Sequence, residues 1–253
     1  MLEQPTIVSV VMPARNEERC IGRALQSIVD AGLPGVEVVV VDDGSTDETA
    51  QIAAGFHGVR VVPSGGVGLI PSLNLGIKSA RGELIARLDA DDWYLPHGLA
   101  RLVETALAHP EVDLVAGGAI EVDAYGRQLG HRYPPADERH LAYQLMAECP
   151  LTHSAVLFRR QSVLAAGGYG RGMEEWAEDY ALWSQMVNAG QRMRHVPEPV
   201  TIREIRVGRV SDVHLKSQAL MAKMKRMTEE PLKTYAQEWA PLQQMVEIGR
   251  AHV

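Results

Sequence analysis

The stretch VEVVVVDDGSTDET, residues 36–49, decides the fold class of this chain. Its valines at 38–41 lack a polar alternation, which is typical of a strand buried on both faces of a parallel sheet. Asp42 and Asp43 follow directly, and Gly44 allows a sharp turn. The next residues predict a helix with Ser45 or Thr46 as its N-cap. A buried strand, an acidic turn and a helix form the start of a βαβ unit.

The same alternation continues on both sides of this stretch. Further strands are predicted at 7–12, 59–62, 83–88 and 112–117, and further helices at 17–32, 70–80 and 97–109. The second half predicts a hairpin within 117–130, strands at 153–158, 191–196 and 200–207, and helices at 159–168 and 178–190. This order indicates an α/β fold with a doubly wound sheet. We expect one α/β domain over residues 1–211 and a helical extension over 212–253.

Bulk composition excludes several classes of protein. The chain has 253 residues and a formal net charge of -7, which disfavours nucleic acid and anionic membranes as main partners. Cys20 and Cys149 do not make a disulfide framework or a zinc pattern, and two reduced cytosolic thiols are expected. No signal peptide or membrane-spanning segment is predicted. A cytoplasmic enzyme or binding protein fits these limits.

Acidic residues follow three of the predicted strands. They lie in MPARNE after the first strand, in VDDGSTD after the second, and in LDADD, where Asp89, Asp91 and Asp92 occur together. Two carboxylates about 5 Å apart repel by roughly 3 kcal/mol at an effective dielectric constant of about 20. A hard divalent cation or solvent exposure could offset this repulsion. Ligands in such sheets bind at the carboxyl ends of the strands, so the coincidence favours a ligand site.

Other segments have both a functional and a structural interpretation. The glycines of PSGGVGLIPSLNLG, residues 63–76, do not form a nucleotide fingerprint, and we expect a loop that closes over a site and then a helix. Asp179 shares a helix face with Leu182 and Trp183, so it is expected to be half-buried and could act as a general base. The alternative is an acidic first turn that complements the helix dipole. His153 is expected in a core or cleft wall, and His214 could offer a nitrogen to a metal.

Several motifs resemble family 2 glycosyltransferases, in the order found there, over roughly residues 6–200. They are VSVVMPARNEERCIGRALQSI, VEVVVVDDGSTDET, SLNLGIKSARGELIARLDADDWYLP, HSAVLFRR, GGYG and EDYALW. The form of the LN and RLDADD segments resembles the subgroup of bacterial polysaccharide and lipopolysaccharide enzymes. The resemblance implies the GT-A fold: a mixed, mostly parallel sheet flanked by helices, here with C-terminal helices.

The resemblance also implies a function and site residues. It implies inverting transfer of one sugar from a nucleotide diphosphate sugar to an acceptor hydroxyl, and a UDP-sugar is the expected donor. Nucleotide-sugar contacts are expected from Pro13, Ala14, Glu17, Asp42, Asp43, Asn74, Asp89 and Asp91. A Mn²⁺ or Mg²⁺ ion is expected on Asp91 and Asp92 beside Asp89, with His214 as a further candidate ligand. Asp179 is the expected base, and Glu178 is the alternative base.

Some positions depart from the family pattern. Leu73 stands where many members have Arg, and Ala181 replaces an Asp that is common after the ED motif. The QxxRW motif of processive synthases is absent from the sequence, so transfer of a single sugar is expected. The R-x-H motif is not clear in REIRVGRVSD.

Three rival functions stay open at this point. They are a receiver-like domain, a nucleotidyltransferase and a catalytically silent sugar-nucleotide-binding protein. Expected partners are the donor and an acceptor sugar, lipid-linked sugar or other hydroxyl compound. The C-terminal helices are candidates for a homodimer contact or for peripheral contact with the inner face of the membrane.

Overall fold

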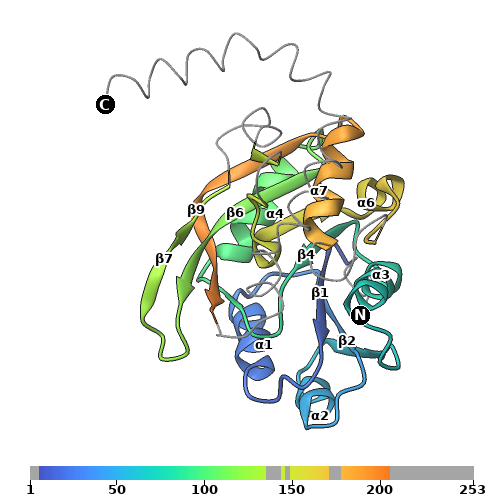
Figure 1. The fold of residues 1–253 in the computed structure, drawn as a ribbon, viewed down its shortest axis with the longest axis vertical. Helices are drawn as coiled ribbons and strands as arrows, with labels where there is room; N and C mark the ends of the chain where they lie inside the picture. Colours follow the sequence, from blue (N-terminus) through green and yellow to red (C-terminus); the bar gives the residue numbers. More distant parts are fainter. Residues whose placement is uncertain (1–5, 135–143, 146–148, 171–177, 206–253) are drawn as a thin grey trace, which may run out of the picture.

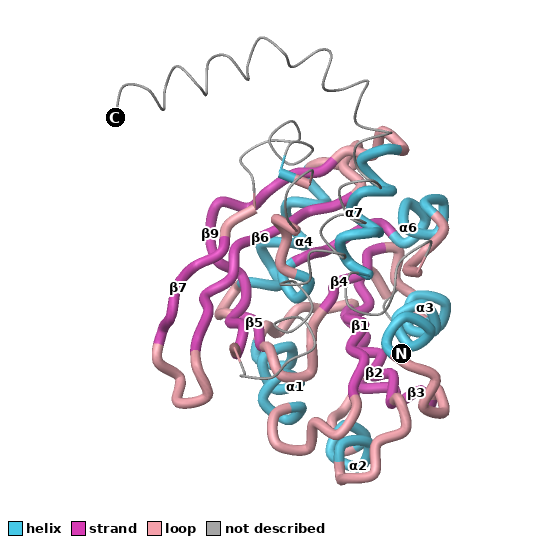
Figure 2. The backbone as a smooth tube through the Cα atoms, in the orientation of Figure 1, coloured by secondary structure: helices cyan, strands magenta, loops and turns pink. Residues whose placement is uncertain are grey.

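A nine-stranded mixed sheet runs through the molecule, with helices on both faces (Figures 1 and 2). The computed structural model describes residues 6–134, 144–145, 149–170 and 178–205. The strand order is β3-β2-β1-β4-β8-β6-β9-β5, and β7 pairs with β6 beside this path. The strands β1, β2, β3 and β4 run parallel, whereas β8 lies antiparallel between β4 and β6. The α/β class and the mixed, mostly parallel sheet are as expected.

The first half forms the regular part of the fold. Its strands are β1 (Val8–Ala14), β2 (Val36–Asp42), β3 (Val59–Pro63) and β4 (Leu84–Arg87). Its helices are α1 (Ile21–Asp30), α2 (Thr49–Ala54) and α3 (Leu69–Ser79). Every residue of β1 is buried, as are the valines at 38–41 of β2. Burial on both faces is therefore confirmed for the stretch that predicted the fold class.

The second half completes the sheet. Its strands are β5 (Trp93–Tyr94), β6 (Leu114–Val122), β7 (Gln128–Arg132), β8 (Val156–Arg159) and β9 (Met193–Glu204). Its helices are α4 (Gly98–Ala108), α6 (Arg160–Ala166) and α7 (Glu178–Asn188). The predicted hairpin is the β6–β7 pair, and α6 ends at Gly167 in the left-handed conformation, as glycine favours.

Two apolar clusters lie on opposite faces of the sheet. One contains buried residues of α3, α6 and α7, and the other contains buried residues of α1, α2 and α4. Alternation along β4 sends Ile85 to the first cluster and Ala86 to the second. The sheet is thus covered on both faces, and its carboxyl edge stays available for a site.

Two local predictions about the start of an element are wrong. The second helix begins at Thr49 and not after Ser45 or Thr46, because the Ser45 hydroxyl instead accepts a hydrogen bond from the Asn16 amide. The Asp47 carboxylate accepts the Thr49 amide hydrogen at 3.0 Å. The strand expected at 153–158 begins only at β8, because a 3₁₀ turn precedes it.

The strands expected at 191–196 and 200–207 are one strand, β9. Pro197 and Pro199 lie within this strand, although proline cannot donate to a sheet ladder. The register of β9 against β6 shifts twice in this segment, so the extra residues of β9 bulge past β6. The bulge accommodates both prolines, and the strand continues past them.

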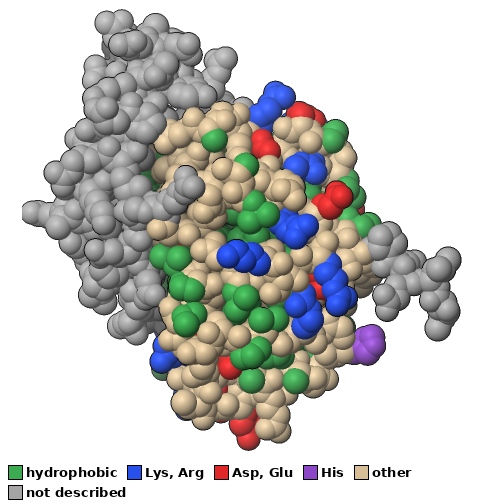
Figure 3. Space-filling model, turned by 90° about the vertical axis from the view of Figure 1, so that its right-hand side faces the viewer, with side chains coloured by type: hydrophobic (Ala, Val, Ile, Leu, Met, Phe, Trp, Pro, Cys, Tyr) green, Lys and Arg blue, Asp and Glu red, His purple; other side chains and the backbone are tan. Residues whose placement is uncertain are grey.

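The surface over α3 and α6 differs in charge from the chain as a whole. Lys and Arg side chains gather near its middle, between apolar side chains, despite the net charge of -7 (Figure 3). Among the described residues, no helix has the length and apolar character needed to cross a membrane. The predicted extension 212–253, with His214, lies outside the described residues.

Candidate active site

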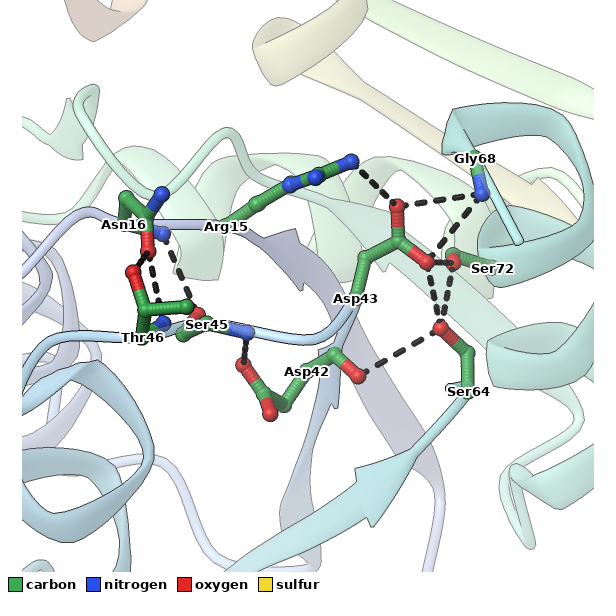
Figure 4. A network of polar contacts seen from close by, with 9 residues as sticks. All are labelled: Arg15, Asn16, Asp42, Asp43, Ser45, Thr46, Ser64, Gly68 and Ser72. Atoms are coloured by element: carbon green, nitrogen blue, oxygen red, sulfur yellow. Dashed lines mark hydrogen bonds and ion pairs between the residues drawn. The ribbon is translucent and has the colours of Figure 1, made fainter. Parts of the chain in front are cut away.

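The loops after β1 and β2 are bound to each other at the carboxyl edge of the sheet (Figure 4). Asn16 has a positive φ of 56°, and its side-chain oxygen accepts hydrogen bonds from the amide and the hydroxyl of Thr46. The Ser45 hydroxyl accepts the Asn16 amide hydrogen at 3.1 Å. The Glu17 amide donates to the Thr49 hydroxyl at 2.7 Å. These contacts hold the two loops in one fixed arrangement.

Asp43 lies at the centre of a network of donors (Figure 4). Its Oδ1 accepts hydrogen bonds from the hydroxyls of Ser64 at 2.6 Å and Ser72 at 3.1 Å. The Gly68 amide lies 3.2 and 3.1 Å from its two oxygens, and an Arg15 nitrogen lies 3.9 Å from Oδ2. Burial alone raises the pKa of Asp43, but these hydrogen bonds outweigh it and the pKa is lowered. Asp43 is therefore a firmly ionised acceptor.

The end of β1 contacts the backbone of Asp43. Pro13 and Ala14 are buried there, and the Ala14 carbonyl accepts the Asp43 amide hydrogen at 2.9 Å. Asp42 is half-buried, and its Oδ1 accepts the Ser45 amide hydrogen at 3.2 Å. These predicted nucleotide contacts thus lie together at one edge of the sheet.

Two further predicted nucleotide contacts already have partners within the protein. Glu17 is partly exposed, and its Oε2 accepts a hydrogen bond from the Cys20 thiol at 2.9 Å. The Asn74 side chain makes two hydrogen bonds of 3.0 Å with the backbone of Tyr169, one as donor and one as acceptor. Asn74 therefore holds the GGYG segment against α3, and its contact with a donor stays a prediction.

The aspartates after β4 differ sharply in their surroundings. The Asp89 side chain is 38% exposed, and its Oδ1 lies 2.6 Å from Arg87 Nη2. Asp92 is 1% exposed and accepts hydrogen bonds from the Ser154 hydroxyl at 2.5 Å and the Glu204 amide at 3.1 Å. Ser154 also lies 3.1 Å from Asp89 Oδ2, so one hydroxyl serves both carboxylates. Burial, followed by the charge of Asp89, raises the pKa of Asp92 to about 7.

Arg87 is a site residue that the sequence analysis did not single out. Its side chain is 1% exposed, and its Nε and Nη1 have no hydrogen-bond partner among the residues that the structure describes. Burial by itself lowers the pKa of Arg87, but the charges of Asp89 and other nearby groups outweigh burial. The pKa of Arg87 is therefore raised overall, and the guanidinium stays charged. The signal was present in RLDADD, because alternation along β4 puts Arg87 on the same buried face as Ile85.

The oxygen donors at this edge fit a shared metal site. Asp89 is open to solvent, and Asp91 is 5% exposed beside it. Within the described ranges, no three His, Cys, Asp or Glu side chains form a group that could hold a metal ion alone. Magnesium typically binds through one or two carboxylates together with substrate phosphates and water. The residues present therefore fit a hard cation that is bound jointly with a diphosphate, and Asp92 stays a predicted ligand.

Helix α7 begins with the two acids that were predicted as candidate bases. Asp179 is half-buried, as expected, and its Oδ1 accepts the Tyr180 amide hydrogen at 2.6 Å. Glu178 is 7% exposed, and burial, followed by the charge of Asp179, raises its pKa to about 8. Burial also raises the pKa of Asp179, and the charge of Asp89 adds to this effect. The two helix acids and Asp89 are thus within electrostatic reach of one another.

His153 lies next to these groups, and its side chain is 9% exposed. Its Nε2 lies 2.7 Å from the Tyr169 hydroxyl, and its Nδ1 lies 3.6 Å from Glu178 Oε1. Its ring packs edge-on against Trp183. Burial, and then the nearby positive charge of Arg87, lowers the pKa of His153 well below its usual value. The imidazole is therefore neutral at physiological pH.

Cys149 contacts the candidate base, and nothing in the sequence indicated this. Its Sγ lies 3.6 Å from Asp179 Oδ2, although 30 residues separate the two along the chain. The Arg132 guanidinium donates to the Cys149 carbonyl oxygen at 2.8 Å. Both cysteines are free, as expected.

Comparison with known proteins places this geometry in context. The sequence model described as Glycosyl transferase family 2 matches residues 9–166. The chain is 28% identical to the amylovoran biosynthesis glycosyltransferase AmsE of Erwinia amylovora, over 79% of this chain and 76% of AmsE.

Two solved structures show the same fold. One is TarS of S. aureus in complex with UDP-GlcNAc, with a TM-score of 0.70 and 20% identity over 89% of this chain and 66% of the TarS chain. The other is the mannosyltransferase PcManGT of Pyrobaculum calidifontis in complex with GDP-Man and Mn²⁺. It has a TM-score of 0.63 and 20% identity over 98% of this chain and 80% of the other.

Proposed function

Because the chain belongs to Glycosyl transferase family 2 and has the GT-A fold, we propose that this glycosyltransferase is inverting and metal-dependent. It moves one sugar from a nucleotide diphosphate sugar to an acceptor hydroxyl. The family, the fold and the enzyme class expected from the sequence are confirmed. One observation carries the finer proposal: Asp43 follows β2, Asp89 and Asp91 follow β4, and Asp179, in the first turn of α7, is within electrostatic reach of Asp89.

We propose that the donor is a UDP-sugar. Asp43 is held ionised by its hydroxyl and amide donors, so Oδ2 can accept a hydrogen bond from an N–H of a base. Pro13 and Ala14 would line the same pocket, with Asp42 and Glu17 in the adjoining loops. TarS was solved with UDP-GlcNAc and with UDP, whereas PcManGT was solved with GDP-Man. The proposal of a uracil base follows the two TarS complexes.

In the proposed chemical step, Asp179 is the base. Its carboxylate takes the proton of the acceptor hydroxyl while that oxygen attacks the anomeric carbon from the face opposite the nucleotide. The bond to the nucleotide diphosphate breaks, so the configuration inverts. Burial raises the pKa of Asp179, which makes it a better proton acceptor than an exposed aspartate. Glu178, with its pKa of about 8, is mostly protonated at neutral pH and is the weaker candidate.

Asp91 and Asp92, beside Asp89, would hold the Mg²⁺ or Mn²⁺ ion. When bound, the ion neutralises charge on the departing nucleotide diphosphate. Arg87 keeps the Asp89 carboxylate in place through its 2.6 Å contact. Asp92 supports the same loop by joining Ser154 to the end of β9.

The acceptor is proposed to be a sugar, a lipid-linked sugar or another hydroxyl compound in bacterial surface polysaccharide synthesis. The name of AmsE, an amylovoran biosynthesis enzyme, supports this setting. A cytoplasmic location, with peripheral contact at the inner face of the membrane, suits such an acceptor. The predicted helices over 212–253 are the proposed contact with the membrane or with a second copy.

Calorimetric titration with UDP, GDP and dTDP, each with and without Mn²⁺, tests the donor assignment. We expect Mn²⁺-dependent binding of UDP, and Asp91→Ala should weaken it. Turnover of UDP-sugars then tests transfer and its stereochemistry. Binding of a donor with neither transfer nor hydrolysis would instead identify a silent sugar-nucleotide-binding protein.

A further inference from the structure

A thiol and a carboxylate meet at the acceptor side of the site. Cys149 Sγ lies 3.6 Å from Asp179 Oδ2, within the range of a sulfur hydrogen bond. The other carboxylate oxygen, Oδ1, accepts the Tyr180 amide hydrogen at 2.6 Å. Among the described residues, each oxygen of the candidate base thus has one donor.

The position of Cys149 is held from two directions. The Arg132 guanidinium, at the end of β7, donates to the Cys149 carbonyl oxygen at 2.8 Å. The Cys149 side chain packs against the apolar cluster that contains Trp183 of α7. The sulfur therefore has a fixed place next to the start of α7.

The chemistry of this thiol suits a donor. Burial, and then the charge of Asp179, raises the pKa of Cys149 well above its usual value, so the sulfur keeps its proton. A second acceptor, the Leu151 carbonyl oxygen, lies 3.7 Å from Sγ. The thiol can donate to Asp179 while that carboxylate is ionised, and to Leu151 after Asp179 has taken a proton.

We propose that Cys149 is a positioning residue, whose thiol orients the Asp179 carboxylate by a hydrogen bond to Oδ2. The proposal rests on the proposed function, in which Asp179 is the base. The pKa of Asp179 is also raised by the charge of Asp89 and lowered by that of Arg203, and the charge of Asp179 in turn raises the pKa of Glu178. The thiol is thus one of several groups that interact with Asp179. Its distinctive effect is direct contact with the carboxylate.

The infrared S–H stretching band of Cys149 tests the contact without any substrate. In a Cys20→Ser background, only Cys149 contributes this band. We expect Asp179→Asn to shift the band to higher frequency, because an amide oxygen is a weaker acceptor than a carboxylate. An unchanged band in Asp179→Asn would overturn the proposal.

The chain offers a matched control for this measurement. Cys20 makes the corresponding thiol contact with the Glu17 carboxylate at the donor side, at 2.9 Å. In a Cys149→Ser background, Glu17→Gln should shift the Cys20 band. The same Glu17→Gln change should leave the Cys149 band where it is. A Cys149 band that moves in Glu17→Gln would mean that the shift does not report local contact, and it would overturn the assignment.

The pH profile of turnover tests the consequence for catalysis. Without the thiol hydrogen bond, which lowers the pKa of Asp179, that pKa rises and the acidic limb of kcat/KM moves to higher pH. We expect Cys149→Ala to lose roughly 3- to 10-fold in kcat/KM on this limb, and Cys149→Ser to recover most of it. Thermal unfolding of both variants checks that they fold, and we expect melting temperatures close to that of the wild type.

The two proposals fail in different ways. If Asp179→Asn keeps near-normal transfer, the base assignment in the proposed function is wrong. If Asp179→Asn abolishes transfer while Cys149→Ala keeps the wild-type pH profile, the role of Cys149 is wrong and the base assignment stands.

Discussion

Asp43, at the proposed donor side, and the acids of α7, at the proposed acceptor side, are the same kind of group in opposite electrostatic conditions. Both sets are largely removed from water. Asp43 has hydrogen-bond donors from Ser64, Gly68 and Ser72, and its pKa is lowered. Among the described residues, Glu178 and Asp179 have fewer donors, the charge of Asp179 acts on Glu178, and the pKa values of both are raised.

The difference teaches that burial does not by itself decide the charge of a carboxylate. Burial raises the pKa in both regions, and the donors decide which way the balance falls. An ionised Asp43 suits permanent recognition of a ligand N–H group. A carboxylate with a raised pKa at Asp179 suits transient uptake of a proton.

The largest expected effect comes from removing the acceptor-side base. Asp179→Asn should lower the rate of sugar transfer by roughly 10²- to 10⁴-fold, because the amide cannot take the acceptor proton. Binding of UDP should stay within about twofold by calorimetry, because Asp179 makes no proposed donor contact. Glu178→Gln is the matched control and should keep most of the transfer rate.

On the proposed donor side, Asp43→Ala should destabilise the protein by about 1–3 kcal/mol, because it removes the acceptor that the Ser64 and Ser72 hydroxyls and the Gly68 amide share. Urea unfolding at neutral pH measures the change. Asp42→Ala is the comparison variant, since Asp42 is half-buried and accepts the Ser45 amide hydrogen at 3.2 Å. It should cost less than about 1 kcal/mol. Equal losses in the two variants would contradict the central role of Asp43.

The pH dependence of stability should separate the two regions. The pKa of Glu178 is raised from 4.5 to about 8, so its burial is least costly below pH 4.5, where the carboxyl is protonated in both states. As pH rises from 4.5 to 8, the unfolded chain releases this proton first and stability falls. The slope is at most about 1.4 kcal/mol per pH unit. Glu178→Gln should flatten the unfolding free energy over this window, and an unchanged curve would refute the raised pKa.

Removing a single donor to Asp43 should have a smaller effect than removing the Asp43 carboxylate itself. Ser64→Ala removes the 2.6 Å hydrogen bond and should cost about 1 kcal/mol at neutral pH. The lowered pKa of Asp43 stabilises the fold above pH 3.8, and this contribution is lost as pH falls through the folded pKa. The difference between Ser64→Ala and wild type should therefore shrink in acid. A pH-independent difference in urea unfolding would point to packing alone.

Much of the fold was predictable because its signals are local. The valines of β2 and the strand–helix alternation predicted the parallel half of the sheet within a few residues. The prediction of two strands within 191–207 was wrong because the continuity of β9 depends on its bulged register against β6, which is not a local property of the sequence.

The candidate site was predictable only in part. Asp43, Asp89, Asp91 and Asp179 lie in short motifs that can be recognised from their order along the chain. The contacts of Ser154 with Asp92 and of Cys149 with Asp179 join residues that are 62 and 30 positions apart. No pattern in either segment indicated these partners.

By itself, then, the sequence determined the class of fold, the glycosyltransferase family and the edge of the sheet at which acidic side chains gather. Apolar periodicity and short motifs are properties of neighbouring residues, so they survive without a structure. The tertiary structure was needed to show that the pKa of Asp43 is lowered and that the pKa values of Glu178 and Asp179 are raised. This difference depends on the donors and charges that folding brings from distant segments, and on how much water folding removes.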